Sequence, residues 1–163
     1  MTISYTELAT PIGTLRLVGG AQGLRQVVLG AEPDDGQVDP SWMPDAWPLR
    51  AAIAQLEAYF AGTRTTLELP LDASGSPFQD RVWQALVAIP YGETTSYADV
   101  AVQIGQPRAI RAVGRANATN PLPIVVPCHR VVGRSGVLTG YGGGLDRKRW
   151  LLAHEAEVAA GAR

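Results

Sequence analysis

Short apolar runs separated by turn residues make up the first thirty positions of the chain. The runs ISYTELA, TLRLVG and LRQVVLG are joined by TPIG and GGAQG, in which proline and glycine are typical of tight turns. This pattern predicts an antiparallel meander of strands over residues 3–30. Residues 31–46 are acidic and rich in proline, so we expect a loop or linker there.

A helical period follows this loop. Between residues 48 and 62 apolar side chains recur every three or four positions, and a glycine ends the pattern. These side chains are Ala52, Ile53, Leu56, Tyr59 and Phe60. Residues 66–75 predict a strand or an extended linker. The chain up to this point forms a first domain, which we place at residues 1–72.

The second half of the chain has mainly helical patterns. Ser76 followed by Pro77 is typical of the start of a helix, and an apolar period continues from there. Ser96 with Asp99 forms a capping box, which predicts the start of a second, short helix. A final helix is predicted over residues 145–159.

A helix-turn-helix pattern lies in the middle of this half. The residues GQP at 105–107 predict a turn, and residues 108–118 predict a helix with two opposite faces. Its apolar stripe is Ala109, Ile110, Val113 and Ala116, and its basic stripe is Arg108, Arg111 and Arg115. A short helix, a tight turn and an arginine-lined helix are typical of DNA-binding domains. We therefore place a second domain at residues 76–157 and expect an α+β protein.

Composition excludes several classes of protein. The 163 residues are 46% hydrophobic, which is sufficient for a buried core. A single cysteine excludes an internal disulfide framework, and two histidines are too few for a convincing zinc site with it. The N-terminus has no signal-peptide pattern, and no apolar run approaches the ~18 residues of a membrane helix. We expect a cytosolic protein with a reduced thiol.

The charges are unevenly distributed along the chain. The net charge is -1, but residues 104–150 hold eight basic residues and one acidic residue. This segment therefore carries +7 and the remainder about -8. Such an asymmetry suggests that one half of the chain binds an anion. An ordinary charged surface is the plainer alternative.

The only cysteine, Cys128, lies in an unusual setting. A lone cysteine in an apolar run is more often a buried, inert side chain. Here His129 and Arg130 are adjacent, and such neighbours favour the thiolate. Three prolines between residues 121 and 127 stiffen the approach, and the glycine-rich residues 133–145 allow close contact with a ligand. These features together indicate a nucleophile held in position.

Three segments of the chain resemble the O6-alkylguanine-DNA alkyltransferases, also called methylated-DNA–protein-cysteine methyltransferases. They are IPYGETTSYADVA (89–101), RAVGRANATNPLPIVVPCHRVV (111–132) and SGVLTGYGGGLDRKRWLLAHE (135–155). The likeness is strong from about Ser76 to Glu155, whereas the first 70 residues match only in general character. It implies an RNase H-like N-terminal domain with an antiparallel sheet and a helix. The C-terminal domain would be a winged helix-turn-helix domain that carries the cysteine loop.

The resemblance implies DNA repair by direct damage reversal. Cys128 would take an alkyl group from O6 of guanine in duplex DNA after base flipping, and O4-alkylthymine is left open as a further substrate. The transfer would be irreversible and occur once per protein, because a thioether has no easy hydrolytic exit. A thiolate attacks an sp³ carbon without a metal, so no metal and no cofactor are expected. The partner would be double-stranded DNA bearing O6-alkylguanine, with no membrane. The protein would be a monomer, with or without cooperative binding along the DNA.

Five positions match the family's catalytic residues. Cys128 would be the alkyl acceptor, and His129 the base that takes its proton through a bridging water. Glu155 would orient this histidine, although an exposed helix glutamate is the ordinary interpretation. Asn120 matches the asparagine that ties the recognition helix to the cysteine loop. Tyr97 matches a tyrosine that helps to rotate the nucleotide and donates a proton to N3 of the leaving guanine.

Other positions match DNA contacts and the base pocket. Arg111 would fill the space that the flipped base leaves, and Ala112 and Gly114 would let the helix approach the minor groove, largely independently of sequence. The pocket would be formed by Val131, Leu138, Tyr141, Gly142 and Gly143. Some relatives have serine where this chain has Gly142, so only the backbone N–H would donate a hydrogen bond to O6 at this position.

Three alternatives compete with this interpretation. A non-catalytic alkyltransferase-like protein would bind lesions without repairing them, but such proteins lack the cysteine. A transcriptional regulator with a structural cysteine would need a dimer surface or a sensor domain, and neither is evident. A Cys-His hydrolase would need an oxyanion hole and a histidine distant in sequence rather than adjacent.

Overall fold

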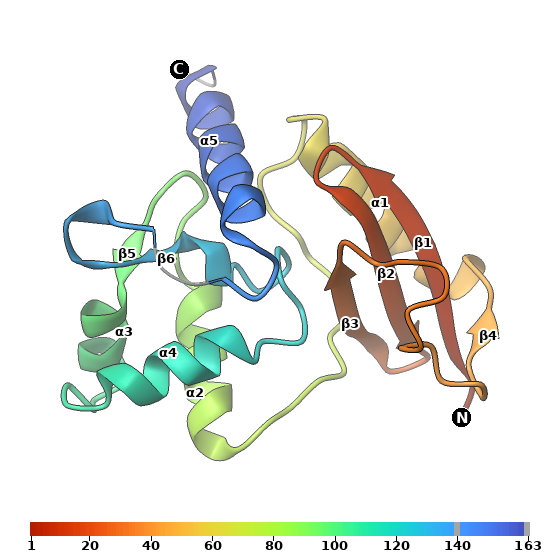
Figure 1. The fold of residues 1–163 in the computed structure, drawn as a ribbon, viewed down its shortest axis with the longest axis horizontal. Helices are drawn as coiled ribbons and strands as arrows, with labels where there is room; N and C mark the ends of the chain where they lie inside the picture. The colour runs from red at the N-terminus through yellow and green to blue at the C-terminus, as the bar shows by residue number, and fades with distance from the viewer. Residues whose placement is uncertain (139–140, 162–163) are drawn as a thin grey trace. The chain divides into compact units, whose positions relative to one another are not determined.

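The computed structural model of the chain describes residues 1–138 and 141–161. The chain divides into two compact units, Met1–Ala73 and Ser74–Arg163. The first unit holds a β-sheet with a helix, and the second is mainly helical (Figure 1). The predicted α+β class is therefore confirmed.

The sheet of the first unit contains the predicted meander. Its strands are β1 (Ile3–Thr10), β2 (Gly13–Gly20), β3 (Gly23–Leu29) and β4 (Met43–Pro44), in the order β3-β2-β1-β4. β1, β2 and β3 pair antiparallel, as predicted. β4 differs, because it pairs parallel to β1 within residues that predict a loop. The sheet is thus antiparallel except at this short edge strand.

One helix packs against this sheet. A 3₁₀ turn, η1 (Trp47–Leu49), leads into α1 (Arg50–Phe60), which lies across one face of the strands (Figure 1). The buried side chains of α1 are Ala52, Leu56 and Tyr59. Phe60 is only half-buried, contrary to the predicted stripe. Phe60 lies eight residues after Ala52, so its side chain points about 80° away from that of Ala52 around the helix axis. Tyr59, seven residues after Ala52, points within about 20° of it.

A buried arginine gives the acidic loop a structural role. Arg16 on β2 is fully buried, on the face opposite Leu15 and Leu17. Its guanidinium donates to both carboxylate oxygens of Asp35 at 3.0 and 3.2 Å, and to the carbonyl of Glu32 at 2.9 Å. The loop after β3 therefore covers the second face of β2, and one of its acidic side chains, Asp35, forms an internal charge pair with Arg16.

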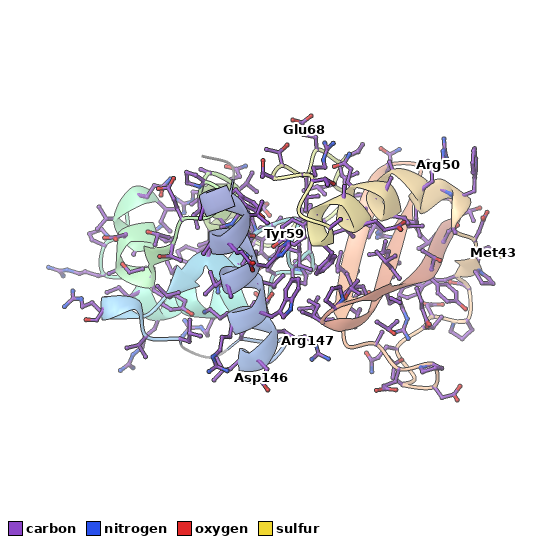
Figure 2. The ribbon with its side chains drawn as sticks, turned by 90° about the horizontal axis from the view of Figure 1, so that it is seen from above. Met43, Arg50, Tyr59, Glu68, Asp146 and Arg147 are labelled. Carbon is purple, nitrogen blue, oxygen red and sulfur yellow. The ribbon has the colours of Figure 1, made fainter. Side chains whose placement is uncertain are left out.

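A cavity of about 750 Å³ lies at one end of this unit. Met43 of β4 and Arg50 at the start of α1 line it, and both lie at the same end of the unit (Figure 2). It contains none of the predicted site residues. Among the helices of the described residues, none combines the length and hydropathy needed to span a bilayer.

The second unit contains the four predicted helices. They are α2 (Pro77–Val87), α3 (Tyr97–Gln103), α4 (Ile110–Ala118) and α5 (Leu145–Gly161). Between them lie the strands β5 (Thr95–Ser96) and β6 (Val131–Val132) and the 3₁₀ turns η2 (Cys128–Arg130) and η3 (Arg134–Gly136). β5 and β6 pair parallel. This short sheet joins the helix-turn-helix to the segment that follows the cysteine.

The helix-turn-helix is formed by α3 and α4 (Figure 1). The buried face of α4 consists of Val113, Ala116 and Asn117. Ile110 was predicted on this face but is 42% exposed, so that prediction is wrong. Ile110 is the first residue of α4 and lies almost a full turn before the packed residues. Helical periodicity gives the direction of a side chain but does not show where packing begins.

The capping residues at the start of α2 offer a test of how much a helix cap stabilises the fold. Ser76 Oγ accepts from the N–H of Gln79 at 3.1 Å, and Gln79 Oε1 accepts from the N–H of Ser76 at 2.9 Å. Replacing Ser76 by alanine should lower the free energy of unfolding by about 1 kcal/mol, because one helix N–H loses its partner. Urea unfolding measures this change. Ser74→Ala, two residues earlier at an exposed position, should stay within about 0.5 kcal/mol of the parent.

Candidate active site around Cys128

The loop before the cysteine is held by Asn120. Its Nδ2 donates to the carbonyl of Val126 at 2.8 Å, and its Oδ1 accepts from the N–H of Leu122 at 2.9 Å. Within this loop Ile124 is buried and has a φ of 74°, a conformation that β-branched residues rarely adopt. The structure thus places Asn120 across the turn between α4 and the cysteine.

Cys128 begins the 3₁₀ turn η2. It is a free thiol, 4% exposed, and its N–H donates to the carbonyl of Val126 at 2.7 Å. Pro127 precedes it, and the N–H of Arg130 closes the turn on the Pro127 carbonyl at 3.0 Å. The Cys128 carbonyl accepts from the N–H of Val131 at the end of the turn. The backbone on both sides of the thiol is therefore fixed.

The short sheet brings Tyr97 toward this turn. Thr95 pairs with Val131 and Ser96 with Val132, so α3 begins beside the strand that leaves the cysteine turn. Tyr97 is the first residue of α3 and is half-buried. A Cβ at Gly114 of α4 would lie 4.0 Å from Tyr97 Cδ1. An alanine at this position would therefore make an ordinary van der Waals contact with the tyrosine ring.

A buried cluster joins the turn to α5. His129 Nε2 lies 2.7 Å from Glu155 Oε2. Arg130 Nε donates to Glu155 Oε1 at 2.7 Å, and its Nη2 donates to Oε2 at 3.0 Å. Arg130 Nη1 also donates to the carbonyl of Ile89 at 2.8 Å. Glu155 and His129 are almost completely buried, so Glu155 is not the exposed helix glutamate of the ordinary interpretation.

These contacts determine the protonation of the cluster. Burial by itself would raise the pKa of Glu155, but the hydrogen bonds from His129 and Arg130 outweigh it and lower the pKa to about 2. Burial lowers the pKa of His129, against the opposing effect of Glu155. An ionised carboxylate can only accept, so Nε2 of a neutral His129 carries the N–H that donates to Glu155. The lone pair of this imidazole then lies on Nδ1, a buried atom without a hydrogen-bond partner among the described residues.

The environment of the thiol is largely apolar but has three polar neighbours. Burial raises the pKa of Cys128, and the Asn120 side chain, the Tyr141 hydroxyl and Lys148 oppose this shift. Burial also raises the pKa of Tyr141, and the charge of Cys128 adds to that shift. The Tyr141 hydroxyl is buried and makes no hydrogen bond of standard geometry within the described residues. A thiol in this setting needs a base to become a thiolate.

Lys148 was not singled out from the sequence, yet it is fully buried. Its Nζ donates to the carbonyl of Val131 at 2.6 Å and lies 5.9 Å from the centre of the Tyr141 ring. The buried face of α5 consists of Lys148, Leu151 and Glu155. Their spacing of three and four residues could have revealed the lysine, because it places Lys148 on the same face as the matched glutamate.

Asn117 is a second residue that sequence reasoning missed. It is 4% exposed, and its Nδ2 donates to the carbonyl of Cys128 at 3.3 Å. The other histidine, His154, stacks on Trp150 with ring centres 4.7 Å apart. Within the described part of the chain, no three His, Cys, Asp or Glu side chains gather as a metal site requires.

Besides Tyr97 of α3, the predicted DNA-contact residues lie on α4. Arg111 is exposed, and Ala112 and Gly114 are half-buried. Within the described residues, none of them forms a hydrogen bond or ion pair with the cysteine turn. The structure thus separates these residues, at the surface of the helix-turn-helix, from the buried cluster of Cys128, His129 and Glu155.

The predicted pocket residues are only partly described. Val131 is buried in β6, whereas Leu138 is half-buried and Gly142 is exposed. A Cβ at Gly142 would lie 3.7 Å from the carbonyl oxygen of Ala118 at the end of α4. The Gly143 carbonyl accepts a hydrogen bond from Arg147 Nη1 at 2.9 Å. Arg147 lies in the first turn of α5 (Figure 2). Residues 139–140 of the predicted pocket loop lie outside the described residues.

Comparison with protein families identifies both units. Residues 3–73 match the ribonuclease-like domain of 6-O-methylguanine DNA methyltransferases, and residues 77–157 match the DNA-binding domain of the same proteins. The chain belongs to this family. The resemblance seen in the sequence is confirmed, as is the ribonuclease-like character of the first unit.

Individual methyltransferases agree over nearly the whole chain. The methylated-DNA–protein-cysteine methyltransferase of Mycobacterium tuberculosis (strain H37Rv) is 51% identical over 160 residues, which cover 96% of this chain and 94% of the relative. That of Mycolicibacterium paratuberculosis is 53% identical over 156 residues, covering 94% and 92%. The crystal structure of Mycobacterium tuberculosis OGT in complex with DNA has a TM-score of 0.87 at 48% identity, covering 95% of this chain and 94% of that one.

The low pKa of Glu155 predicts a specific dependence of stability on pH. A carboxyl whose pKa falls from 4.5 to about 2 on folding stabilises the fold above pH 4.5, and this stabilisation disappears as the pH falls toward 2. It amounts to about 3 kcal/mol. Glu155→Gln should lose it at every pH, so its urea-unfolding free energy should vary less between pH 5 and about 2.5.

Glu157→Gln is the matched control, since Glu157 is exposed on the same helix. It should keep the parental dependence on pH. If Glu155→Gln lost stability as steeply as the parent over this range, the assignment of the low pKa to Glu155 would be wrong.

Proposed function

We propose that this methyltransferase repairs DNA by direct reversal, moving an alkyl group from O6 of alkylguanine in duplex DNA to Cys128. One observation carries the proposal. The residue after the chain's only thiol is a buried imidazole, whose Nε2 lies 2.7 Å from the Glu155 carboxylate and whose Nδ1 has no hydrogen-bond partner among the described residues. Family membership and a relative solved in complex with DNA support the same activity.

The first step is activation of the thiol. His129 takes the proton of Cys128 at Nδ1, through a bridging water, and becomes an imidazolium. Glu155 stabilises this cation, because its carboxylate remains ionised and accepts a hydrogen bond from the N–H at Nε2. Arg130 holds the carboxylate from the other side and does not itself contact the substrate. The thiolate then has a pre-oriented acid–base pair behind it.

Alkyl transfer follows as a displacement at carbon. A bond forms between the Cys128 sulfur and the alkyl carbon while the bond from that carbon to O6 breaks. The electron pair passes to the guanine ring, and the Tyr97 hydroxyl supplies a proton at N3, which its place at the start of α3 beside β5 supports. The imidazolium of His129 and the tyrosinate left at Tyr97 then return to their neutral forms by proton exchange with water, and the proton on N3 moves to N1 in the same way. The products are guanine and an S-alkyl cysteine. A thioether is a poor leaving group, so each protein acts once.

Delivery of the base requires the second domain, residues 76–157, to bind duplex DNA through α4. The thiol is 4% exposed, so a stacked base cannot reach it and must be flipped out. Arg111 occupies the vacated space, while Ala112 and Gly114 allow close approach to the minor groove. Val131, Leu138, Tyr141 and the residues Gly142 and Gly143 surround the extruded base. We assign the activity to a monomer in the cytoplasm, where the acceptor thiol stays reduced.

Intact mass measurement tests the transfer. One equivalent of duplex DNA containing O6-methylguanine should add a single CH₂ unit to the protein, located on Cys128, and restore guanine in the DNA. Cys128→Ala should abolish transfer and still bind the duplex, because the thiol is buried and contributes no charge. Absence of an adduct at stoichiometric protein would refute the proposed function. Loss of DNA binding in Cys128→Ala would show that the residue also has a structural role.

Substitution of Arg111 tests its role in base flipping. Arg111→Ala should slow repair of duplex DNA about tenfold or more, because extruding a stacked base costs a few kcal/mol. Reaction with free O6-methylguanine should be nearly unchanged, since no base pair is opened. Arg149→Ala removes one exposed arginine from α5 and controls for the lost charge. Equal losses with both substrates would contradict the proposed role of Arg111.

A further inference from the structure

Asn117 is a buried amide to which the proposed function gives no role. It lies on the packed face of α4 beside Val113 and Ala116, with 4% of its surface exposed. An apolar side chain of similar size would fill this position without burying a polar group. Its one hydrogen bond among the described residues runs from Nδ2 to the carbonyl of Cys128, at 3.3 Å.

The carbonyl that Asn117 holds belongs to the peptide between the nucleophile and the base. A peptide is planar, so the direction of this carbonyl fixes the plane that joins the Cα atoms of Cys128 and His129. The same oxygen accepts from the N–H of Val131. Both acceptor sites of the oxygen are then used, and a rotation of this peptide would break both bonds. Asn117 therefore restricts how the thiol and the imidazole are oriented toward each other.

A second asparagine holds the peptide on the other side of the turn. Asn120 donates to the carbonyl of Val126, the same oxygen that accepts from the N–H of Cys128. Asn117 lies in the last turn of α4, the helix that carries Arg111, and Asn120 lies two residues beyond the end of that helix. The proposed DNA-binding helix and the turn that follows it thus support the backbone of the nucleophile from two points.

The remaining atom of the amide shows which half of Asn117 matters. Its Oδ1 is buried and has no hydrogen-bond partner among the described residues. A buried acceptor without a partner lowers the stability of the fold, so this oxygen gives no reason for an amide at this position. The benefit lies in the donor, Nδ2. A carboxylate at this position would have nearly the same shape and no donor.

We propose that Asn117 is a positioning residue for alkyl transfer, which sets the geometry between Cys128 and His129 by donating to the Cys128 carbonyl. This inference rests on the proposed function. Asn117 touches neither the alkyl group nor the DNA and acts through the peptide of the nucleophile. A misplacement of reacting groups by about 1 Å can slow a reaction about a hundredfold, so a single amide can have a large effect on rate.

Three variants separate positioning from general stability. Asn117→Leu removes the donor and keeps an apolar volume, and Asn117→Asp keeps the shape without the donor. Val113→Ala is the control, because it leaves a cavity on the same face of α4 and keeps the amide. For each variant we would measure the affinity for duplex DNA and the single-turnover rate of methyl transfer. The pH profile of Cys128 alkylation by iodoacetamide would be measured as well, since this reaction needs neither DNA nor a methylated guanine.

Both Asn117 variants should transfer the methyl group about ten to a hundred times more slowly, with the affinity for DNA changed less than about twofold. Their iodoacetamide profiles should shift to higher pH, because His129 no longer faces the thiol correctly. Val113→Ala should keep the parental profile. A parental rate and profile in Asn117→Leu, or the same shift in Val113→Ala, would overturn the positioning role. Failure of the unmodified protein to transfer the methyl group would refute the proposed function instead.

A second measurement needs no variant. The chain has one cysteine, so a ¹³C label in the cysteine carbonyl reports on this peptide alone. A scalar coupling across the hydrogen bond between the Asn117 side-chain nitrogen and this carbon, with slow solvent exchange of the amide protons, supports the proposal. Fast exchange without a coupling overturns it, even if the substituted proteins do not fold.

Discussion

The carboxylate of Glu155 is the charge on which the site depends. An isolated carboxylate would be very unfavourable in this interior, but His129 and Arg130 both bind it. Arg130 extends the network to the carbonyl of Ile89, beyond the end of α2. One buried anion therefore connects α5, the cysteine turn and the segment after α2. It also binds Nε2 of His129, the proposed base, so the fold and the proposed chemistry share a single constraint.

The backbone around Cys128 is held by side chains in place of a regular ladder. The three prolines between residues 121 and 127 have no N–H to donate, and buried carbonyls need partners. Asn120, Asn117 and Lys148 supply them, at the carbonyls of residues 126, 128 and 131. A loop that is stiffened by prolines therefore has fewer backbone donors, and polar side chains in the core replace them. This need explains why an amide and an ammonium lie in the interior.

Local signals in the sequence predicted most of the fold. Capping residues such as Ser76 act within one turn of helix, and the Cys128–His129 pair with Glu155 was recognisable from the family motif. Burial of a polar side chain is decided by packing between distant segments, and for that reason Asn117 and Lys148 were missed. For the same reason, the sequence overestimates the positive charge available to bind DNA. Of the eight basic residues in 104–150, Arg130 and Lys148 are buried. Ile110 was misplaced because periodicity does not show where a helix meets its neighbours.

The cluster at Glu155 also bears on how the protein matures. Its bonds join residues that are 25, 26 and 41 positions apart, so they close much longer loops than the hydrogen bonds within a helix do. Until they form, Cys128 is an ordinary cysteine of an unfolded chain, without an aligned base. The base and the carboxylate proposed for alkyl transfer are therefore aligned with the thiol only when the second unit is folded.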